Sequence, residues 1–170
     1  MDPQHVDCGG GGHTGWNLAW SANLWARLMK GDKALATIEE QMKRQVNENL
    51  FNRCGGPFQI DGNLGAPAAI AEMLVQSRLR ADGAESKITD RKSQSADLKY
   101  EIDLLPALPK DWASGSAKGL RTRGGYSVDM EWKDGKVIAC RIKGRDKQEV
   151  KVRMNGKIKT IETSVGLDSL

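Results

Sequence analysis

Apolar residues in the first third of the chain recur with the spacing of α-helices. Between Thr14 and Met29 they cover almost the whole circumference of a helix, and Arg27 is the only charged residue within the stretch. A helix that is apolar on all sides is typical of one enclosed by other helices. We therefore expect a buried helix here, with Trp20 and Trp25 in the core.

Two further helices are predicted after the first. Asp32 is a suitable N-cap for the second, whose opposite face is charged. The third is expected to begin near Pro67, because proline is favoured in a first helical turn, and to end near Gln76. The apolar face of the second helix is formed by Leu35, Ile38, Met42 and Val46.

Beyond a polar stretch at residues 78–99, which we interpret as a surface excursion, the hydrophobic period drops to two. Residues 126–132 alternate between apolar and polar and reach Asp134-Gly135, and residues 150–154 lead in the same way into Asn155-Gly156. Such dipeptides between alternating runs are strong β-hairpin signals. The sequence therefore predicts an antiparallel β region.

These patterns indicate an α+β chain in two parts. Residues 1–99 are expected to hold helices and loops, and residues 100–170 a β domain, with Leu104–Pro109 as the return from helix to sheet. Three helices cannot cover one another's apolar faces with only a small sheet beside them. The chain therefore has the pattern of the end of a larger helical domain followed by a β domain.

Composition and charge exclude several functional classes. The chain is 39% hydrophobic and 28% charged, which is unlike a disordered protein. Residues 1–109 carry 12 basic and 14 acidic side chains, whereas residues 110–170 carry 14 and 8. The basic residues of the second part alternate with acidic and apolar ones, so we do not expect nucleic-acid binding. No apolar run approaches the roughly 18 residues of a membrane span, and no secretory signal is expected at the start.

Cysteine spacing argues against a metal centre. Cys8, Cys54 and Cys140 are far apart, and no Cys-x-x-Cys or Cys/His ligand spacing occurs. Three free thiols are the simpler interpretation, and one disulfide is the alternative. We expect no metal and no cofactor.

Two glycine-rich segments contain the candidate site residues. In Gly55–Gly65, Asp61 is either an Asx-turn or capping residue, or a carboxylate displayed as a general base or a ligand for hydroxyls. His13 follows four glycines and is either a hydrogen-bonding site residue or a solvated helix-start residue. Trp16 either belongs to the core or faces a sugar ring. No Ser-His-Asp arrangement, phosphate-binding loop or dinucleotide fingerprint is present.

Several blocks of the chain resemble glycoside hydrolase family 95, a family of α-L-fucosidases with some α-L-galactosidases. The resemblance covers roughly residues 8–145. Its most specific blocks are His13-Thr14-Gly15-Trp16, Leu24-Trp25-Ala26-Arg27-Leu28, Asn49-Leu50-Phe51, Pro57-Phe58-Gln59-Ile60-Asp61-Gly62-Asn63-Leu64-Gly65 and Leu104-Leu105-Pro106-Ala107-Leu108-Pro109.

The resemblance implies a fold, an activity and site residues. The fold would be the last helices of an (α/α)6 barrel followed by a C-terminal β-sandwich-like domain. The activity would be hydrolysis of terminal α-linked L-fucose, typically α-1,2-linked, with inversion at the anomeric carbon. Asp61 would activate the attacking water, and His13, Trp16 and Asn63 would bind substrate. The complete enzyme would lie in the bacterial periplasm or outside the cell.

The general acid expected of the family has no counterpart in these residues. We therefore expect the chain to be inactive alone and to need the remainder of the catalytic barrel. Because its apolar helix faces would be left uncovered, we also expect it to self-associate through them. The alternatives are a non-catalytic carbohydrate-binding or assembly module, and an α-L-galactosidase of the same family.

Overall fold

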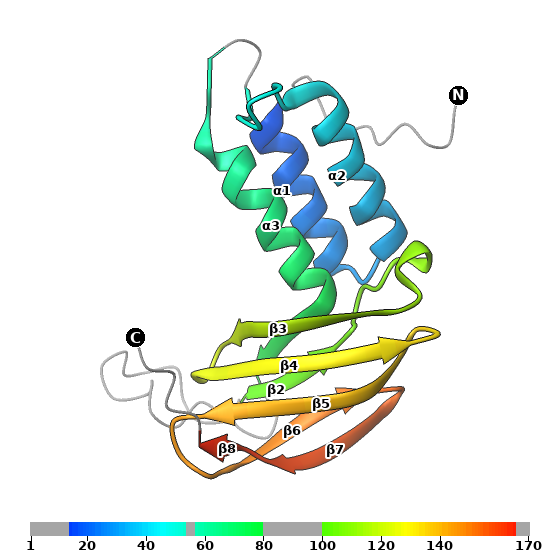
Figure 1. Ribbon diagram of the computed structural model, residues 1–170, viewed down its shortest axis with the longest axis vertical. Helices are drawn as coiled ribbons and strands as arrows, with labels where there is room; N and C mark the ends of the chain where they lie inside the picture. The colour runs from blue at the N-terminus through cyan, green and yellow to red at the C-terminus, as the bar shows by residue number, and fades with distance from the viewer. Residues whose placement is uncertain (1–13, 54–56, 80–99, 166–170) are drawn as a thin grey trace. The chain divides into compact units, whose positions relative to one another are not determined.

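The computed structural model describes residues 14–53, 57–79 and 100–165, which belong to two compact units (Figure 1). The first, the helical unit, comprises residues 1–74 and 106–112; the second, the β unit, comprises residues 75–105 and 113–170. The predicted boundary between residues 99 and 100 adjoins the stretch 80–99, which lies outside the described residues. None of the helices in the described ranges is long and apolar enough to cross a membrane.

Three α-helices form the helical unit: α1 (Gly15–Arg27), α2 (Gly31–Gln45) and α3 (Ile60–Leu74), with a short 3-10 helix, η2 (Lys110–Trp112). Small residues allow the helices to approach closely. Trp25, Leu35, Ile70 and Trp112 pack around this core. The core itself consists of Ala22, Ala26, Ala34, Ile38, Ala69, Met73 and Ala107.

The helix α1 is buried on one face only, contrary to the prediction that it is enclosed. Leu18, Ala22 and Ala26 are fully buried, whereas the side chain of Trp20, predicted to be core, is 57% exposed. The exposed apolar residues recur every four positions and so form a stripe along the helix, which we call the α1 stripe. It consists of Trp16, Trp20, Leu24 and Leu28.

The other two helices also differ from the prediction. Met42, expected on the apolar face of α2, is exposed, because the buried face runs instead through Ala34, Thr37, Ile38 and Gln41. Helix α3 begins at Ile60, not near Pro67, which lies inside it. Glycines are weak helix formers, so Gly62 looked like part of a loop.

The segment Leu104–Pro109 leads from a strand to the helical unit, and not from helix to sheet as expected. Leu104–Pro109 was predicted to lead from helix to sheet, but it leaves strand β2 (Tyr100–Leu104) and residues 106–112 rejoin the helical unit. There the Ala107 N–H donates a hydrogen bond to the Met73 carbonyl oxygen (3.1 Å).

The β unit contains two four-stranded sheets. One has the order β1-β2-β6-β7, with β1 (Val75–Leu79), β6 (Glu149–Met154) and β7 (Lys157–Glu162). The other has the order β3-β4-β5-β8, formed by β3 (Gly115–Thr122), β4 (Tyr126–Lys133), β5 (Lys136–Gly144) and β8 (Ser164–Val165). Each sheet is mixed, because β2 pairs with β6 and β5 pairs with β8 in parallel. The α+β class is confirmed, and the expectation of a purely antiparallel β region is wrong.

Both predicted hairpins are present. Asp134-Gly135 joins β4 to β5 and Asn155-Gly156 joins β6 to β7, and all four residues have positive φ angles of 52–74°. Two successive positive φ angles are typical of the type I′ turn that Asn-Gly and Asp-Gly favour. The Asn155 amide then bridges the two sheets, since it donates to the Val137 carbonyl oxygen and accepts from the Val137 N–H (both 2.9 Å).

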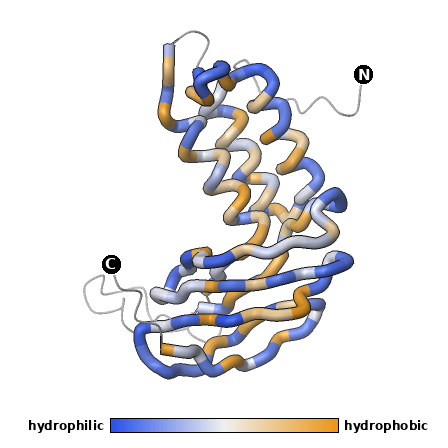
Figure 2. Tube along the Cα trace, in the orientation of Figure 1, coloured by the Kyte–Doolittle hydropathy of each residue, from blue (hydrophilic) through white to orange (hydrophobic). Residues whose placement is uncertain are grey.

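Hydrophobic and hydrophilic positions alternate along the strands of the β unit (Figure 2). Its core includes Ile102, Val128, Ile142 and Val152, all with at most 1% exposure. Within this unit, buried Asp103 pairs with Arg78 (2.6 Å) and Arg153 (3.2 Å) from the neighbouring strands. Burial raises the pKa of Asp103, and the two guanidinium groups act in the opposite direction. The ion pairs therefore hold strands β1, β2 and β6 in register.

Candidate functional site

The predicted site residues that the structure describes lie in the first turns of two helices. Trp16 is the second residue of α1, and Asp61 and Asn63 are the second and fourth residues of α3. Figure 1 shows α1 and α3 running in the same direction, so that both N-termini lie at one end of the helical unit. His13 lies outside the described residues.

The loop between α2 and α3 covers this end of the helical unit. It folds back on itself through bridges between Val46 and Asn52 and between Arg53 and Phe58. The Phe51 and Phe58 rings stack with their centroids 4.7 Å apart. The described parts of this loop, residues 46–53 and 57–59, are therefore held to each other next to the first turn of α3.

Asn63 connects helix α3 to this loop. Its Oδ1 accepts the Asn52 N–H (2.8 Å), and its Nδ2 donates to the Leu50 carbonyl oxygen (2.8 Å). Both ends of the amide are thus engaged with the backbone. The structure gives Asn63 a loop-holding role, and its contact with substrate stays a prediction.

Asp61 presents its carboxylate to solvent from the first turn of α3. Because it is the second helical residue, it does not occupy the N-cap position. Within the described residues, no hydrogen bond or ion pair engages its side chain. The unpaired N–H groups at a helix N-terminus favour a negative charge there.

Trp16 contributes a further aromatic side chain at this end of the unit. Its side chain is 43% exposed, and its ring centroid lies 6.3 Å from that of Trp20. The two indoles are tilted by 31° relative to each other, and both are exposed to solvent. Of the four predicted site residues, the structure therefore brings Trp16, Asp61 and Asn63 to one end of the helical unit.

Sequence reasoning missed two polar residues at this end of the helical unit. Asn52 and Gln41 are each 1% exposed, although amide side chains are mostly found at the surface. Gln41 Nε2 donates to the Gly62 carbonyl oxygen (3.0 Å), so α2 also fixes the first turn of α3. Gln41 occurs on a helix face that the apolar spacing did not mark as buried, and no signal in the sequence singled out Asn52.

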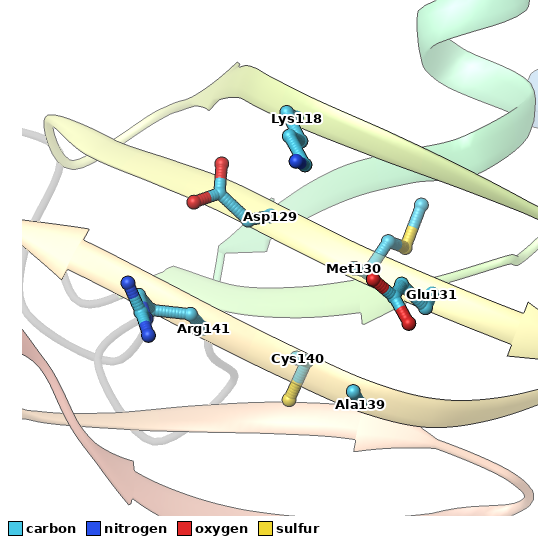
Figure 3. Close-up of a pocket in the computed structure, with 7 residues that line it drawn as sticks. All are labelled: Lys118, Asp129, Met130, Glu131, Ala139, Cys140 and Arg141. Atoms are coloured by element: carbon cyan, nitrogen blue, oxygen red, sulfur yellow. The ribbon is translucent and has the colours of Figure 1, made fainter.

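A separate pocket of about 350 Å³ lies on the β3-β4-β5 surface of the β unit (Figure 3). No predicted site residue lines it. Asp129 accepts the Gly119 N–H (2.8 Å) and lies 3.5 Å from Lys143 Nζ. The thiol of Cys140 has its pKa raised by burial. The described residues contain no group of His, Cys, Asp and Glu side chains suited to a metal ion, and Cys8 and Cys54 lie outside them.

Asp129 makes the stability of the β unit depend on pH. The Gly119 N–H and Lys143 lower its pKa, so the unfolded chain binds more protons than the folded one in acid. The stabilisation is present above the unfolded pKa of about 3.9 and is lost as the pH falls through the lower folded value. We expect Asp129→Asn to lower the free energy of unfolding by about 1 kcal/mol at pH 7, and by less at pH 3.

Urea titrations of the unchanged chain and of Asp129→Asn, each at pH 7 and pH 3, measure this difference in the free energy of unfolding. Glu131→Gln, an exposed change on the same strand, is the control. An equal loss for Asp129→Asn at pH 7 and pH 3 would contradict the assignment.

Comparison with known proteins finds two domain matches along the chain. Residues 4–74 match the glycosyl hydrolase family 95 catalytic domain, and residues 93–168 match the glycoside hydrolase family 95 C-terminal domain. "Probable alpha-fucosidase A" of Aspergillus niger is 33% identical over 153 residues, which are 85% of this chain and 18% of that protein. "Alpha-L-fucosidase 2" of Arabidopsis thaliana is 35% identical over 136 residues, 73% of this chain and 14% of that protein.

The chain thus spans less than a fifth of the length of these relatives. The catalytic-domain match covers the three α-helices, and the C-terminal-domain match, which follows it, covers most of the strands. They leave only residues 1–3, 75–92 and 169–170 unmatched. The chain belongs to glycoside hydrolase family 95.

Proposed function

We propose that this chain is part of an inverting α-L-fucosidase that removes terminal α-linked L-fucose, typically α-1,2-linked, from glycans. The helical unit would be the last part of an (α/α)6 catalytic barrel, and the β unit would be its C-terminal β-sandwich-like domain. The observation that supports this most is the exposed position of Asp61 in the first turn of α3, in a chain of this family.

In the proposed mechanism, Asp61 is the general base. Its carboxylate accepts a proton from a water molecule while the water oxygen attacks the anomeric carbon of fucose. The bond to the leaving oxygen breaks, and a carboxylic acid on the other side of the sugar gives that oxygen a proton. In inverting enzymes the two carboxyl groups are about 6.5–9.5 Å apart, which leaves room for the water.

The sugar would be held by groups close to Asp61. Trp16 offers an apolar ring face, and His13 and Asn63 are the proposed hydrogen-bonding partners of the hydroxyl groups. The amide of Asn63 is already engaged with the loop, so its contribution to substrate would come through the second N–H of its Nδ2 and the remaining acceptor capacity of its oxygen.

The general acid would come from the remainder of the catalytic barrel. Two glutamates on the helices are already paired with arginines: Glu40 pairs with Arg44 on the same helix, and Glu72 lies 3.3 Å from Arg27. We therefore propose that these 170 residues alone are inactive.

Two measurements test this proposal. The purified chain is expected to release no fucose from an aryl α-L-fucoside above background. The enzyme that contains this chain with the rest of its catalytic domain is expected to release β-L-fucose first, seen by proton NMR before mutarotation. Initial release of the α-anomer, or turnover by the isolated chain that Asp61→Asn abolishes, would contradict the proposal. A preference for α-L-galactosides would favour the related activity of the family.

A further inference from the structure

The side chain of Asn52 lies against both helix α1 and helix α3. A methyl group added at Gly15 in α1 or at Gly62 in α3 would overlap its side-chain amide. At Gly62 the three nearest atoms all belong to that amide. The two glycines therefore accommodate Asn52, and each is adjacent in the sequence to a predicted site residue, Gly15 to Trp16 and Gly62 to Asp61.

The backbone around Asn52 is bonded in several directions. Its N–H donates to Asn63 Oδ1 (2.8 Å), and its carbonyl oxygen accepts from the Gln59 N–H (3.2 Å). The next residue, Arg53, accepts the Gly15 N–H at its carbonyl oxygen (3.1 Å). A single loop residue and its neighbour thus connect α1 to α3.

The side-chain oxygen of Asn52 is buried, and no described residue bonds to it. Leaving a buried amide oxygen without a partner costs stability. A residue selected only for packing at this position would be apolar, as in the alanine-rich core below it. The shape and polarity of asparagine point to a role beyond filling space.

We propose that Asn52 is a positioning residue that sets the N-terminal turns of α1 and α3 against each other, and so determines how Trp16 and Asp61 are presented to substrate. This rests on the proposed catalytic role of Asp61. Catalytic groups need their supporting side chains to hold them to within about 0.5 Å. The Asn52 amide, between two glycines that admit nothing larger, provides such a support.

A double-mutant cycle tests the contact in this chain itself. Gly62→Ala is expected to raise the equilibrium constant for unfolding of the helical unit about tenfold or more, because the methyl group collides with Asn52. In the Asn52→Ala background the collision disappears, and alanine is a better helix former than glycine. There the same change should have less than about a twofold effect.

Gly65→Ala is the matched control on the same helix. Its methyl group would meet Ala19 Cβ at 2.7 Å and not Asn52, so Asn52→Ala should leave its cost unchanged. Denaturation followed by circular dichroism at 222 nm gives all the values. If Asn52→Ala does not fold, Asn52→Gly, which also removes the overlapping atoms, takes its place. An equal cost for Gly62→Ala in both backgrounds would overturn the proposal.

Amide hydrogen exchange separates positioning from general stability. In Asn52→Ala, exchange of the Gly15 N–H is expected to accelerate about tenfold more than that of Ala22 in the core of the same helix, because local opening does not require global unfolding. The NMR signals of the Trp16 indole and the Asp61 carboxylate should shift in this variant and stay in place in Gly65→Ala. Equal acceleration at both amides, with unshifted signals, would show a structural role only.

These readouts do not depend on activity. If Asp61→Asn left the enzyme fully active, the proposed function would fail while the coupling between Asn52 and Gly62 could still be measured. If the coupling were absent but Asp61→Asn inactivated the enzyme, only the role of Asn52 would fail.

Discussion

Asp61→Asn, made in the enzyme that contains this chain and the rest of its catalytic domain, is expected to lower kcat about 10³-fold and to change KM less than about threefold. Asparagine keeps the size of the side chain but cannot accept the proton of the attacking water, and general-base catalysis contributes about 10²–10⁴-fold. A loss confined to kcat indicates an interaction made in the transition state. Steady-state kinetics with an aryl α-L-fucoside measure both constants.

Asp32→Asn is the matched control for this prediction. Asp32 is also an exposed aspartate in the first turn of a helix, α2, where its Oδ1 accepts the Lys110 N–H (2.9 Å). It should change kcat less than about twofold, since surface changes away from a site have small effects. Equal losses in the two variants, or an undiminished kcat in Asp61→Asn, would contradict the role of Asp61.

The isolated chain is expected to self-associate at micromolar concentration. The four residues of the α1 stripe have side chains that are 43–61% exposed, and Met42 on α2 is 51% exposed. Soluble monomers rarely leave apolar patches larger than a few hundred Å² uncovered. At about 25 cal/mol per Å², covering roughly 600 Å² of apolar surface is worth on the order of 15 kcal/mol before the cost of association. In the complete enzyme the rest of the barrel would cover the same surface.

Sedimentation velocity measures the association state. Replacing Trp20 and Leu24 by lysine should restore a monomer, because both side chains belong to the α1 stripe. Ile138→Lys, at a side chain that is 64% exposed on β5, is the control and should leave the dimer or larger oligomer intact. A compact monomer of the unchanged chain at micromolar concentration would contradict the prediction.

The elements that the sequence predicted well are those set by local chemistry. Asp134-Gly135 and Asn155-Gly156 specify tight turns through their own backbone preferences, and the alternating residues beside them form the paired strands. The parallel pairs of β2 with β6 and β5 with β8 join residues far apart in the chain. Nothing in a local hydrophobic period specifies such partners.

The features that the sequence predicted wrongly have one physical cause: they depend on contacts between residues that are far apart in the chain. Gly62 looked like a loop residue, but it is helical and leaves space for the Asn52 amide. Trp20 looked like core, but smaller residues on the opposite face of α1 form the contact with the other helices. The site was predicted through the motif around Asp61, whereas Asn52 became visible only once its contacts with two helices were known.

The acidic limb of the pH–rate profile tests most directly whether Asp61 is the general base. In the enzyme that contains this chain and the rest of its catalytic domain, kcat/KM is expected to fall at low pH as the base is protonated and at high pH as the acid is deprotonated. The residual activity of Asp61→Asn should lose the acidic limb and keep the basic one. An acidic limb that is unchanged in Asp61→Asn would show that another group accepts the proton.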